Sequence, residues 1–189
     1  MAMCARRMLK DGELKKNTVV ATVMSNLGLE RAMHDMGGHL VRTAVGDRYV
    51  VAAMREGGFN LGGEQSGHLI FLDHASTGDG TIAALQVLAL MMLTGLPISA
   101  LAQSSMERVP QVLENVNLSA RKPLDEMKLL SSATDKVTRE LGSEGRVLIR
   151  WSGTEAKLRI MLEGPNEDSL HVWAKELAEA AKKDTRKDV

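Results

Sequence analysis

The first half of the chain alternates between short extended runs and helical segments with one apolar side. The clearest helix follows Asn26, a residue type that caps helices, and its apolar residues recur at i, i+3, i+4 and i+7 from Leu29. The elements expected around it are a partial helix at 3–16, strands at 18–24, 39–45 and 59–61, and a helix at 46–55. This alternation is typical of an α/β layer with crossover connections.

The most apolar helix of the chain is expected after a further short strand at 69–72. Asp79 is placed to start this helix, which would run from 80 to 93. Because it is apolar nearly all round, we expect it to be packed inside the core. A Gly-Leu-Pro turn at 95–97 closes it, and 98–103 adds one or two helical turns.

The pattern changes around Arg108-Val-Pro110, which divides the chain into predicted domains at 1–107 and 108–189. The second domain is expected to hold a strand at 111–118, a helix at 124–141, strands at 146–151 and 157–163, and a last helix striped from Leu170 to Ala181. The order β-α-β-β-α predicts an antiparallel sheet with two helices on one face. The fold class is therefore an α/β mixed-sheet domain followed by a small α+β domain, with a frayed tail at 182–189.

The connection between the last two predicted strands, Arg150-Trp-Ser-Gly-Thr-Glu155, combines hydroxyls, a glycine and a flanking arginine. In the outgoing strand Leu158 and Ile160 alternate with Arg159, so this second arginine is expected on the opposite face. Backbone amides, hydroxyls and two guanidiniums that converge here would form a phosphate site. The same letters also fit a helix capping box or an ordinary hairpin loop, and spacing alone leaves these alternatives open.

A second candidate loop is Gly62-Gly-Glu-Gln-Ser-Gly-His68, whose glycines allow ligand atoms to approach the backbone. It is neither a Walker loop nor a Gly-x-Gly-x-x-Gly motif, and Glu64 would repel a phosphate. A carboxylate, an amide and a hydroxyl suit the hydroxyls or amine of a sugar, although a tight solvated connection remains the alternative. An acid–base pair of Glu64 and His68 is chemically possible. The spacing of the nearby histidines and aspartates matches no common metal motif.

Composition narrows the classes of function. With 189 residues and 44% apolar content, the chain is long enough for one large or two small cores. A formal charge of zero gives no reason to expect nucleic acid or an anionic membrane as a partner. We expect no secretory signal, because the start has positive charge but no apolar core after it, and no bilayer span, because the most apolar run, 82–93, is too short. The single cysteine, Cys4, fits a reducing cytoplasm.

Both loops resemble those of the α-D-phosphohexomutases, the first the phosphate-binding loop and the second the sugar-recognition loop. Three further segments, Thr22-Val-Met-Ser-Asn26, Val45-Gly-Asp-Arg-Tyr-Val50 and Thr77-Gly-Asp-Gly80, are similar to the bacterial phosphoglucosamine mutase branch of that family. The resemblance extends from about residue 5 to about residue 183, in one order and with matching intervals. It implies that the chain corresponds to the third and fourth domains of a four-domain enzyme.

The resemblance also implies a reaction and roles for residues. Such enzymes interconvert glucosamine 6-phosphate and glucosamine 1-phosphate through glucosamine 1,6-bisphosphate, on the route to UDP-N-acetylglucosamine and peptidoglycan precursors. The implied sugar-binding residues are Glu64, Ser66 and His68, with Asp47 and Arg48 on a further ligand-facing turn. The implied phosphate-binding residues are Arg150, Ser152, Gly153, Thr154, Glu155 and Arg159. Ala156 departs from the proline usual after this loop, which frees φ there without removing a ligand.

The catalytic parts of the family are not matched in this sequence. The family's phosphorylated serine and its Mg²⁺ loop belong to the first two domains, and the chain contains no Asp-x-Asp pair. We therefore expect no catalytic residue and no metal ligand here, and an inactive isolated chain that binds a phosphosugar and partners the N-terminal domains. The alternatives are a stand-alone phosphosugar-binding or regulatory module, or part of a related phosphomannomutase or phosphoglucomutase.

Overall fold

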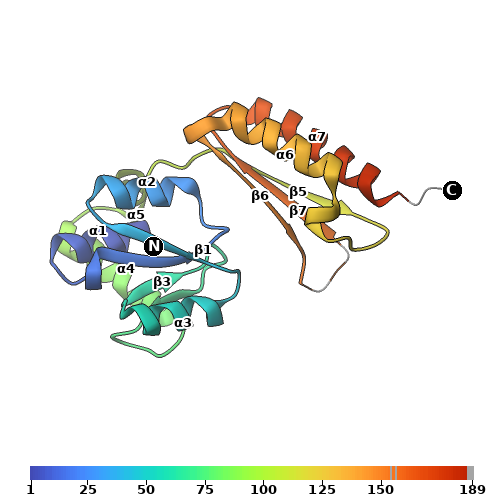
Figure 1. Cartoon of the computed structure of the whole chain (residues 1–189). Helices are drawn as coiled ribbons and strands as arrows, with labels where there is room; N and C mark the ends of the chain where they lie inside the picture. Colours follow the sequence, from blue (N-terminus) through green and yellow to red (C-terminus); the bar gives the residue numbers. More distant parts are fainter. Residues whose placement is uncertain (154, 156, 187–189) are drawn as a thin grey trace. The chain divides into compact units, whose positions relative to one another are not determined.

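The computed structural model describes residues 1–153, 155 and 157–186, which form two compact units, Met1–Arg108 and Val109–Val189 (Figure 1). Thr154, Ala156 and the last three residues lie outside the described part, and so do the predictions made for them. Each unit is considered by itself below.

The first unit is built on a four-stranded mixed sheet. Its strands are β1 (Thr18–Thr22), β2 (His39–Thr43), β3 (Leu61–Gly63) and β4 (Leu69–Phe71), in the order β2-β1-β3-β4. The central strand β1 pairs in parallel with β2 and β3, whereas β3 and β4 are antiparallel. All five residues of β1 are buried, as expected for a parallel strand covered on both faces.

Helices cover both faces of this sheet. They are α1 (Ala2–Lys10), α2 (Leu27–Asp35), α3 (Asp47–Gly57), α4 (Gly80–Thr94) and α5 (Ile98–Ser105), with a 3₁₀ turn at Lys15–Asn17. Because side chains alternate along a strand, Val19 and Ala21 of β1 pack in the cluster formed with α1, α2 and α4. Val20 points to the other face, where it packs with α3. The predicted caps at Asn26 and Asp79 are confirmed, since both side chains accept hydrogen bonds from backbone amides of the helices they start.

Strand β3 begins later than the sequence indicated and extends into the glycine motif. The expected strand at 59–61 is replaced by Leu61–Gly63, so two glycines of the candidate loop belong to the sheet. Gly62 lies opposite Val20, and a Cβ there would come within 2.8 Å of the Val20 carbonyl oxygen and 2.5 Å of the Met54 sulfur. Only a residue without a side chain fits between β1 and α3, which explains a glycine inside a strand.

The prediction that α4 is packed in the core is wrong. Ala83 and Leu90 are buried, but Leu85, Leu88 and Met92 are 59%, 52% and 85% exposed. The apolar residues surround the helix, yet this unit covers only one side of it, and composition does not show which side that is. No single helix in the described part of the chain has the length and apolar composition to cross a membrane; α4 and α5 meet that test only as a pair, bent by 95°.

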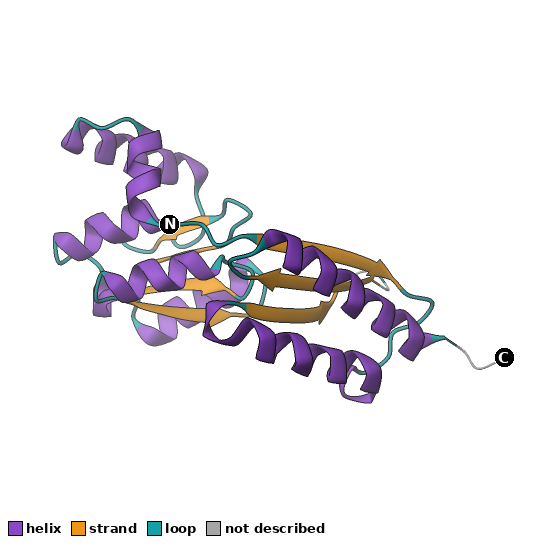
Figure 2. Ribbon diagram, turned by 90° about the horizontal axis from the view of Figure 1, so that it is seen from above, coloured by secondary structure: helices purple, strands orange, loops and turns teal. Residues whose placement is uncertain are grey.

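The second unit is an antiparallel sheet covered on one face by two helices. The strands β5 (Gln111–Asn117), β6 (Arg146–Trp151) and β7 (Lys157–Glu163) lie in the order β5-β7-β6. The helices α6 (Lys128–Leu141) and α7 (Glu167–Thr185) run side by side along this sheet, as Figures 1 and 2 show. Short 3₁₀ turns occur at Leu124–Glu126 and Gly142–Glu144. The last helix continues to Thr185, so fraying does not begin at 182.

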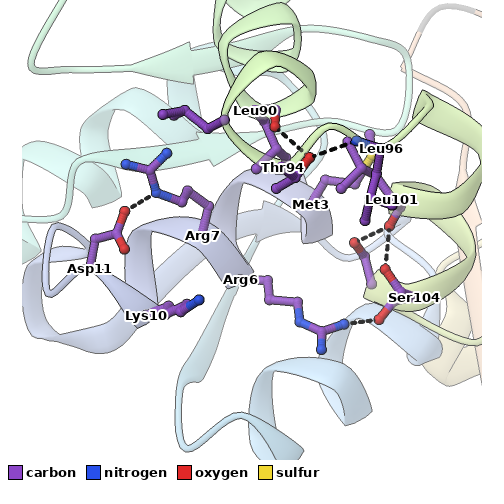
Figure 3. Close-up of a pocket in the computed structure, with 12 residues that line it drawn as sticks. Met3, Arg6, Arg7, Lys10, Asp11, Leu90, Thr94, Leu96, Leu101 and Ser104 are labelled. Carbon is purple, nitrogen blue, oxygen red and sulfur yellow. Dashed lines mark hydrogen bonds and ion pairs between the residues drawn. The ribbon is translucent and has the colours of Figure 1, made fainter.

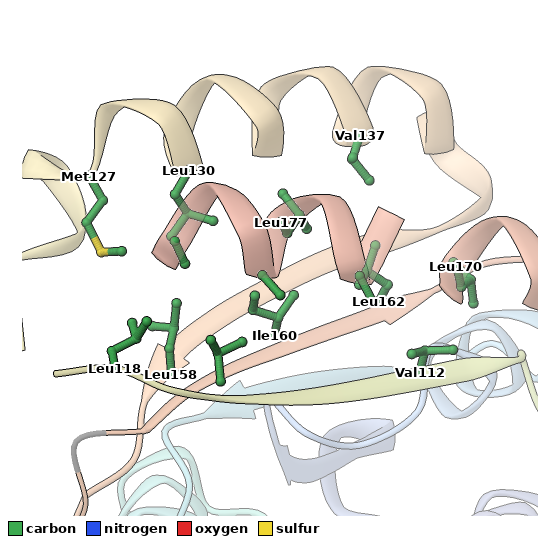
Figure 4. Close-up of a cluster of buried hydrophobic side chains, with 14 of the residues drawn as sticks. Val112, Leu118, Met127, Leu130, Val137, Leu158, Ile160, Leu162, Leu170 and Leu177 are labelled. Atoms are coloured by element: carbon green, nitrogen blue, oxygen red, sulfur yellow. The ribbon is translucent and has the colours of Figure 1, made fainter. Parts of the chain in front are cut away.

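The core of the second unit lies between the two helices and the central strand β7. Leu158, Ile160 and Leu162 of β7 are fully buried against residues of α6 and α7 such as Leu130 and Leu177 (Figure 4). This alternation leaves Lys157, Arg159, Met161 and Glu163 on the face that the helices do not cover. The predicted α/β domain followed by a small α+β domain is confirmed.

An ion pair joins β6 to β7 on the face of the sheet opposite the two helices. Glu163 is fully buried, and its Oε2 accepts a hydrogen bond of 2.5 Å from Nε of Arg146. Replacing Arg146 by alanine leaves a buried carboxylate without this partner, so we expect the free energy of unfolding to fall by about 3 kcal/mol. Chemical denaturation measures this change. Lys136→Ala, which breaks the exposed pair with Glu176, is the control and should leave stability nearly unchanged; equal effects of the two substitutions would contradict the assignment.

Candidate functional site

Two arginines face each other on the open side of the second sheet. The antiparallel register of β6 and β7 places Arg150 directly opposite Arg159. Both Nε atoms are buried without a hydrogen-bond partner, and neither guanidinium forms an ion pair with a described residue. Burial, and then the charge of Arg159, lowers the pKa of Arg150. Two cations held together in this way repel each other and are suited to an anion that bridges them.

The loop that follows Arg150 and β6 holds the other predicted phosphate-binding residues. Ser152 is buried and its backbone N–H donates to the Lys157 carbonyl at 2.8 Å, whereas Gly153 and Glu155 are exposed. The Glu155 carboxylate pairs with the Lys157 ammonium at 3.0 Å. The residues after the loop form a strand, so the helix capping box considered for this motif is wrong. Thr154 lies outside the described residues.

Arg121 holds this loop from a segment that the sequence did not single out. Its Nη2 donates to the carbonyl oxygens of Ser152 and Glu155, the latter at 2.8 Å. Next to it, the Lys122 carbonyl accepts a 3.0 Å hydrogen bond from the indole N–H of Trp151. Since C=O and N–H point in opposite directions across a trans peptide, holding the Ser152 carbonyl aims the Gly153 N–H away from Arg121. Arg121 thus fixes how the loop presents its backbone.

The second candidate loop lies in the first unit, after β3. The Glu64 N–H donates to the His68 carbonyl at 2.9 Å and the Gly67 N–H donates to the Glu64 carbonyl at 3.2 Å, which closes a tight turn. Ser66 and His68 are exposed, and the Ser66 hydroxyl lies 3.2 Å from Nδ1 of His68. This turn occupies the carboxyl edge of the parallel strands, where open α/β sheets bind ligands.

Glu64 connects this turn to the start of α3. Its Oε1 accepts a 2.8 Å hydrogen bond from the N–H of Gly46, which has a φ of +130° that a side chain would strain. Asp47 and Arg48 follow in the first turn of α3 and are exposed. The five sugar-binding candidates therefore lie on this turn and on the first turn of α3, which the hydrogen bond from Gly46 to Glu64 joins.

Arg48 is oriented by a residue that sequence reasoning missed. Its guanidinium lies 4.6 Å from the Tyr49 ring centroid and donates to the Tyr49 hydroxyl at 2.8 Å. A cation stacked on an exposed tyrosine presents a flat polar and aromatic surface beside the loop. An aromatic residue next to an arginine is common, so the sequence offered no signal for this contact.

The remaining acidic residues near the loop have structural partners. Asp73 accepts hydrogen bonds from Lys15 at 2.5 Å and from Asn60 at 2.6 Å, which hold the pKa of its carboxyl below the usual range. Asp79 caps α4. Within residues 1–153, 155 and 157–186 no group of three or more histidine, cysteine or acidic side chains is arranged to hold a metal ion.

Comparison with known families assigns both units. Residues 1–109 match the model of the phosphoglucomutase/phosphomannomutase alpha/beta/alpha domain III, and residues 113–180 match that of the C-terminal domain of the same family. The chain belongs to the phosphoglucomutase/phosphomannomutase family. It therefore corresponds to the C-terminal part of a phosphohexomutase, and the predicted family resemblance is confirmed.

Several curated relatives of this chain are phosphoglucosamine mutases. The chain is 60% identical over 184 residues to that of Sorangium cellulosum, which covers 97% of this chain and 38% of the relative. It is 54% identical to that of Geobacter sp. strain M21, covering 94% of this chain and 39% of the relative. The chain thus spans about two-fifths of the length of these relatives.

Solved structures of the phosphohexomutase family share the fold at low sequence identity. Aspergillus fumigatus N-acetylphosphoglucosamine mutase, in complex with GlcNAc-6P and magnesium, has a TM-score of 0.76 and 20% identity, covering 98% of this chain and 43% of that one. A phosphoglucomutase/phosphomannomutase family protein from Burkholderia thailandensis has a TM-score of 0.71 and 20% identity; the match covers 97% of this chain and 41% of that one.

The arginine pair makes a prediction about stability. Arg150→Met removes the repulsion with Arg159, so in phosphate-free buffer we expect the free energy of unfolding to rise by about 0.5 kcal/mol. In wild type, about 20 mM phosphate should add about 2 kcal/mol for a dissociation constant near 1 mM, and in the variant almost nothing. Chemical denaturation with and without phosphate, at constant ionic strength set with chloride, measures both effects.

Arg139→Met is the control, because Arg139 is exposed on α6, and its stability should respond to phosphate as that of wild type does. If phosphate stabilised Arg150→Met as much as wild type, the anion site would be contradicted.

The role of Arg121 is tested by amide hydrogen exchange. In Arg121→Ala the carbonyls of Ser152 and Glu155 lose their donor, so the loop should open more often. We expect exchange of the Ser152 amide to rise by about tenfold or more, while the amide of Leu148, which faces β7 in the middle of β6, keeps its protection. Unchanged exchange at Ser152 would show that Arg121 does not hold the loop.

Proposed function

We propose that this chain is the sugar- and phosphate-binding part of a phosphoglucosamine mutase. The observation that carries this proposal is the pair Arg150 and Arg159, two half-buried guanidiniums without carboxylate partners among the described residues, in a chain 60% identical to a phosphoglucosamine mutase. The reaction we infer for the whole enzyme interconverts glucosamine 6-phosphate and glucosamine 1-phosphate through the 1,6-bisphosphate, in a cytoplasmic route to UDP-N-acetylglucosamine.

The phosphate that is not being transferred is proposed to bind on the second unit. Arg150 and Arg159 supply bidentate donors from adjacent strands. The Gly153 N–H and the Ser152 hydroxyl are proposed as further hydrogen-bond donors to the phosphate. Thr154 is added to this set because of the family resemblance. Glu155 is part of the same loop, and its carboxylate forms an ion pair with Lys157. This pairing reduces the repulsion between the carboxylate and a bound phosphate.

The sugar is proposed to bind on the first unit. One oxygen of Glu64 is held by Gly46, so the other is available to accept a hydrogen bond from a sugar hydroxyl or from the ammonium of glucosamine. Ser66 and His68 offer further polar atoms on the exposed side of the turn. Asp47 and Arg48 border the same edge, where a carboxylate near the amine would favour the amino sugar over a neutral hexose.

The contribution of these residues is binding and orientation. Held by such residues, a phosphosugar loses part of the freedom that opposes a reaction, and this positioning accelerates transfer to or from a donor held elsewhere. Magnesium in related enzymes offsets charge on the transferred phosphoryl group. The described residues do not fit such an ion, so no metal-dependent step is assigned to this chain, and we propose that the chain alone does not catalyse transfer.

A rough free-energy estimate limits the affinity of the isolated chain. Hydrogen bonds to charged groups contribute about 1.5–3 kcal/mol each, so a few of them total about 5–8 kcal/mol. Ordering the ligand and the loop costs several kcal/mol. About 4 kcal/mol remains, which corresponds to a dissociation constant of about 1 mM.

Calorimetric titration with glucosamine 6-phosphate, glucose 6-phosphate and inorganic phosphate tests the proposal. We expect binding near millimolar that prefers the amino sugar. Arg150→Ala should remove most of the affinity for all three ligands, because it removes a charged donor common to them. Glu64→Gln should reduce the preference for the amino sugar and leave inorganic phosphate unaffected.

Arg139→Ala is the matched control, since this arginine is exposed on α6, and it should bind as wild type does. Equal affinity of wild type and Arg150→Ala would refute the phosphate assignment. A wild type that binds glucosamine 6-phosphate no better than inorganic phosphate would refute the sugar assignment for the isolated chain.

A stand-alone phosphosugar-binding or regulatory module would show the same ligand binding. Such a module has no need of a large uncovered apolar surface, because nothing else packs on it. The exposed leucines and methionine of α4 therefore favour part of a larger enzyme over this alternative.

A further inference from the structure

The loop of the proposed phosphate site is held by a second segment, the connection from β5 to α6. Arg121 of this connection donates from Nη2 to the carbonyl oxygens of Ser152 and Glu155. Its guanidinium carbon lies 6.0 Å from the ring centroid of Trp151. The Trp151 indole N–H in turn donates to the Lys122 carbonyl at 3.0 Å. These four contacts between Arg121, Lys122 and the loop are called the clamp below.

The clamp acts where the two strands no longer hold the backbone. Among the described residues of the loop, the last backbone hydrogen bond between its two sides runs from the Ser152 N–H to the Lys157 carbonyl at 2.8 Å. Gly153 follows, and no described atom beyond its chain neighbours lies within 4 Å of a Cβ placed on it. A glycine in such an open position has many accessible conformations. Hydrogen bonds from outside the strand pair favour one of them.

The β5–α6 connection is itself anchored to the end of α7. The Ser119 hydroxyl donates to the Thr185 carbonyl and the Lys122 ammonium donates to the Asp184 carbonyl, both at 3.4 Å. The Asp184 carboxylate accepts hydrogen bonds from two backbone N–H groups in the first turn of α6. Arg121 is therefore carried on a segment that both helices of the second unit restrain.

An arginine that donates to a carbonyl is not by itself a sign of function. In the first unit, Arg6 of α1 donates to the Ser104 carbonyl of α5, beside a pocket of about 510 Å³ between α1, α4 and α5 (Figure 3). That contact joins two helices. Arg121 differs, because both of its acceptors belong to the loop that follows Arg150.

We propose that Arg121 is a positioning residue for a phosphate monoester, and that it acts by holding the loop in the conformation that binds the anion. The inference rests on the proposed function. Arg121 does not bind the phosphate itself. By holding the Ser152 carbonyl it directs the Gly153 N–H the opposite way across the peptide, so that this N–H and the Arg150 guanidinium are ready for the same anion.

The size of the effect depends on how much of the time the loop has the binding conformation. The apparent dissociation constant equals the intrinsic constant divided by that fraction. If the loop without the clamp keeps this conformation for about a tenth of the time, it binds phosphate about tenfold more weakly. The same factor applies to every ligand with a phosphate group, so the preference for the amino sugar, which is assigned to Glu64, stays unchanged.

NMR titration of Arg121→Ala with inorganic phosphate and with glucosamine 6-phosphate tests the proposal. We expect both dissociation constants to rise by about tenfold and their ratio to remain that of wild type. The loss should persist in about 0.5 M chloride, since positioning is not screened by salt whereas a distant charge is. Arg6→Ala is the matched control, because it removes an arginine–carbonyl contact of the first unit, and it should bind phosphate as wild type does.

The indole N–H of Trp151 provides a spectroscopic readout in wild type, so the test does not depend on the folding of a variant. The chain has two tryptophans, and Trp173→Phe identifies the Trp151 resonance. For a dissociation constant near 1 mM, about 20 mM phosphate should slow solvent exchange of this N–H by about twentyfold, because the anion binds only the held loop. The Trp173 indole is the internal control and should exchange at the same rate with and without phosphate.

Three results would overturn the positioning role. They are wild-type phosphate affinity in Arg121→Ala, a loss of affinity that disappears in about 0.5 M chloride, and an indole exchange rate at Trp151 that does not change although phosphate binds. Failure of the proposed function has a different result, since wild type would then bind neither ligand. The comparison between wild type and Arg121→Ala thus separates the two proposals.

Discussion

The antiparallel register of β6 and β7 is the constraint on which the candidate site depends. Antiparallel pairing sets Arg150 against Arg159, and alternation along each strand sends both to the face that α6 and α7 leave open. The buried leucines and isoleucine of β7 hold this register, because a slip by one residue would turn the arginines into the core and the apolar residues out of it. The packing energy of the second unit therefore maintains two adjacent like charges. The proposed anion would be bound here by groups whose orientation folding has already fixed.

The first unit positions its polar groups by a different device. Its three parallel strands end at one edge, and the loops that follow β2 and β3 are joined there by the hydrogen bond from Gly46 to Glu64. Glycine is required at both ends of this arrangement, at Gly62 because β1 and α3 leave no space and at Gly46 because of its positive φ. The sheet supplies rigidity, and the loops supply the chemistry.

Local patterns predicted much of this architecture. The alternation of Leu158 and Ile160 with Arg159 correctly placed the arginine on the open face, and Asn26 and Asp79 were recognised as caps from residue type alone. Contacts between distant segments were beyond such patterns. Arg121 reaches carbonyls that are 31 and 34 residues away, and nothing near it in the sequence differs from an ordinary loop. The exposure of α4 was missed for a related reason. Its sequence shows that the helix is apolar, but it does not show which sides of the helix other elements cover.

The uncharged stretch from Gly80 to Ser105 also bears on the fate of such a chain in a cell. Chaperones and proteases sort proteins by the apolar surface that they expose, and a stripe left uncovered on α4 keeps a folded polypeptide within their reach. Any element that packs against α4 would hide this stripe, so the lifetime of the folded polypeptide depends on whether α4 is covered.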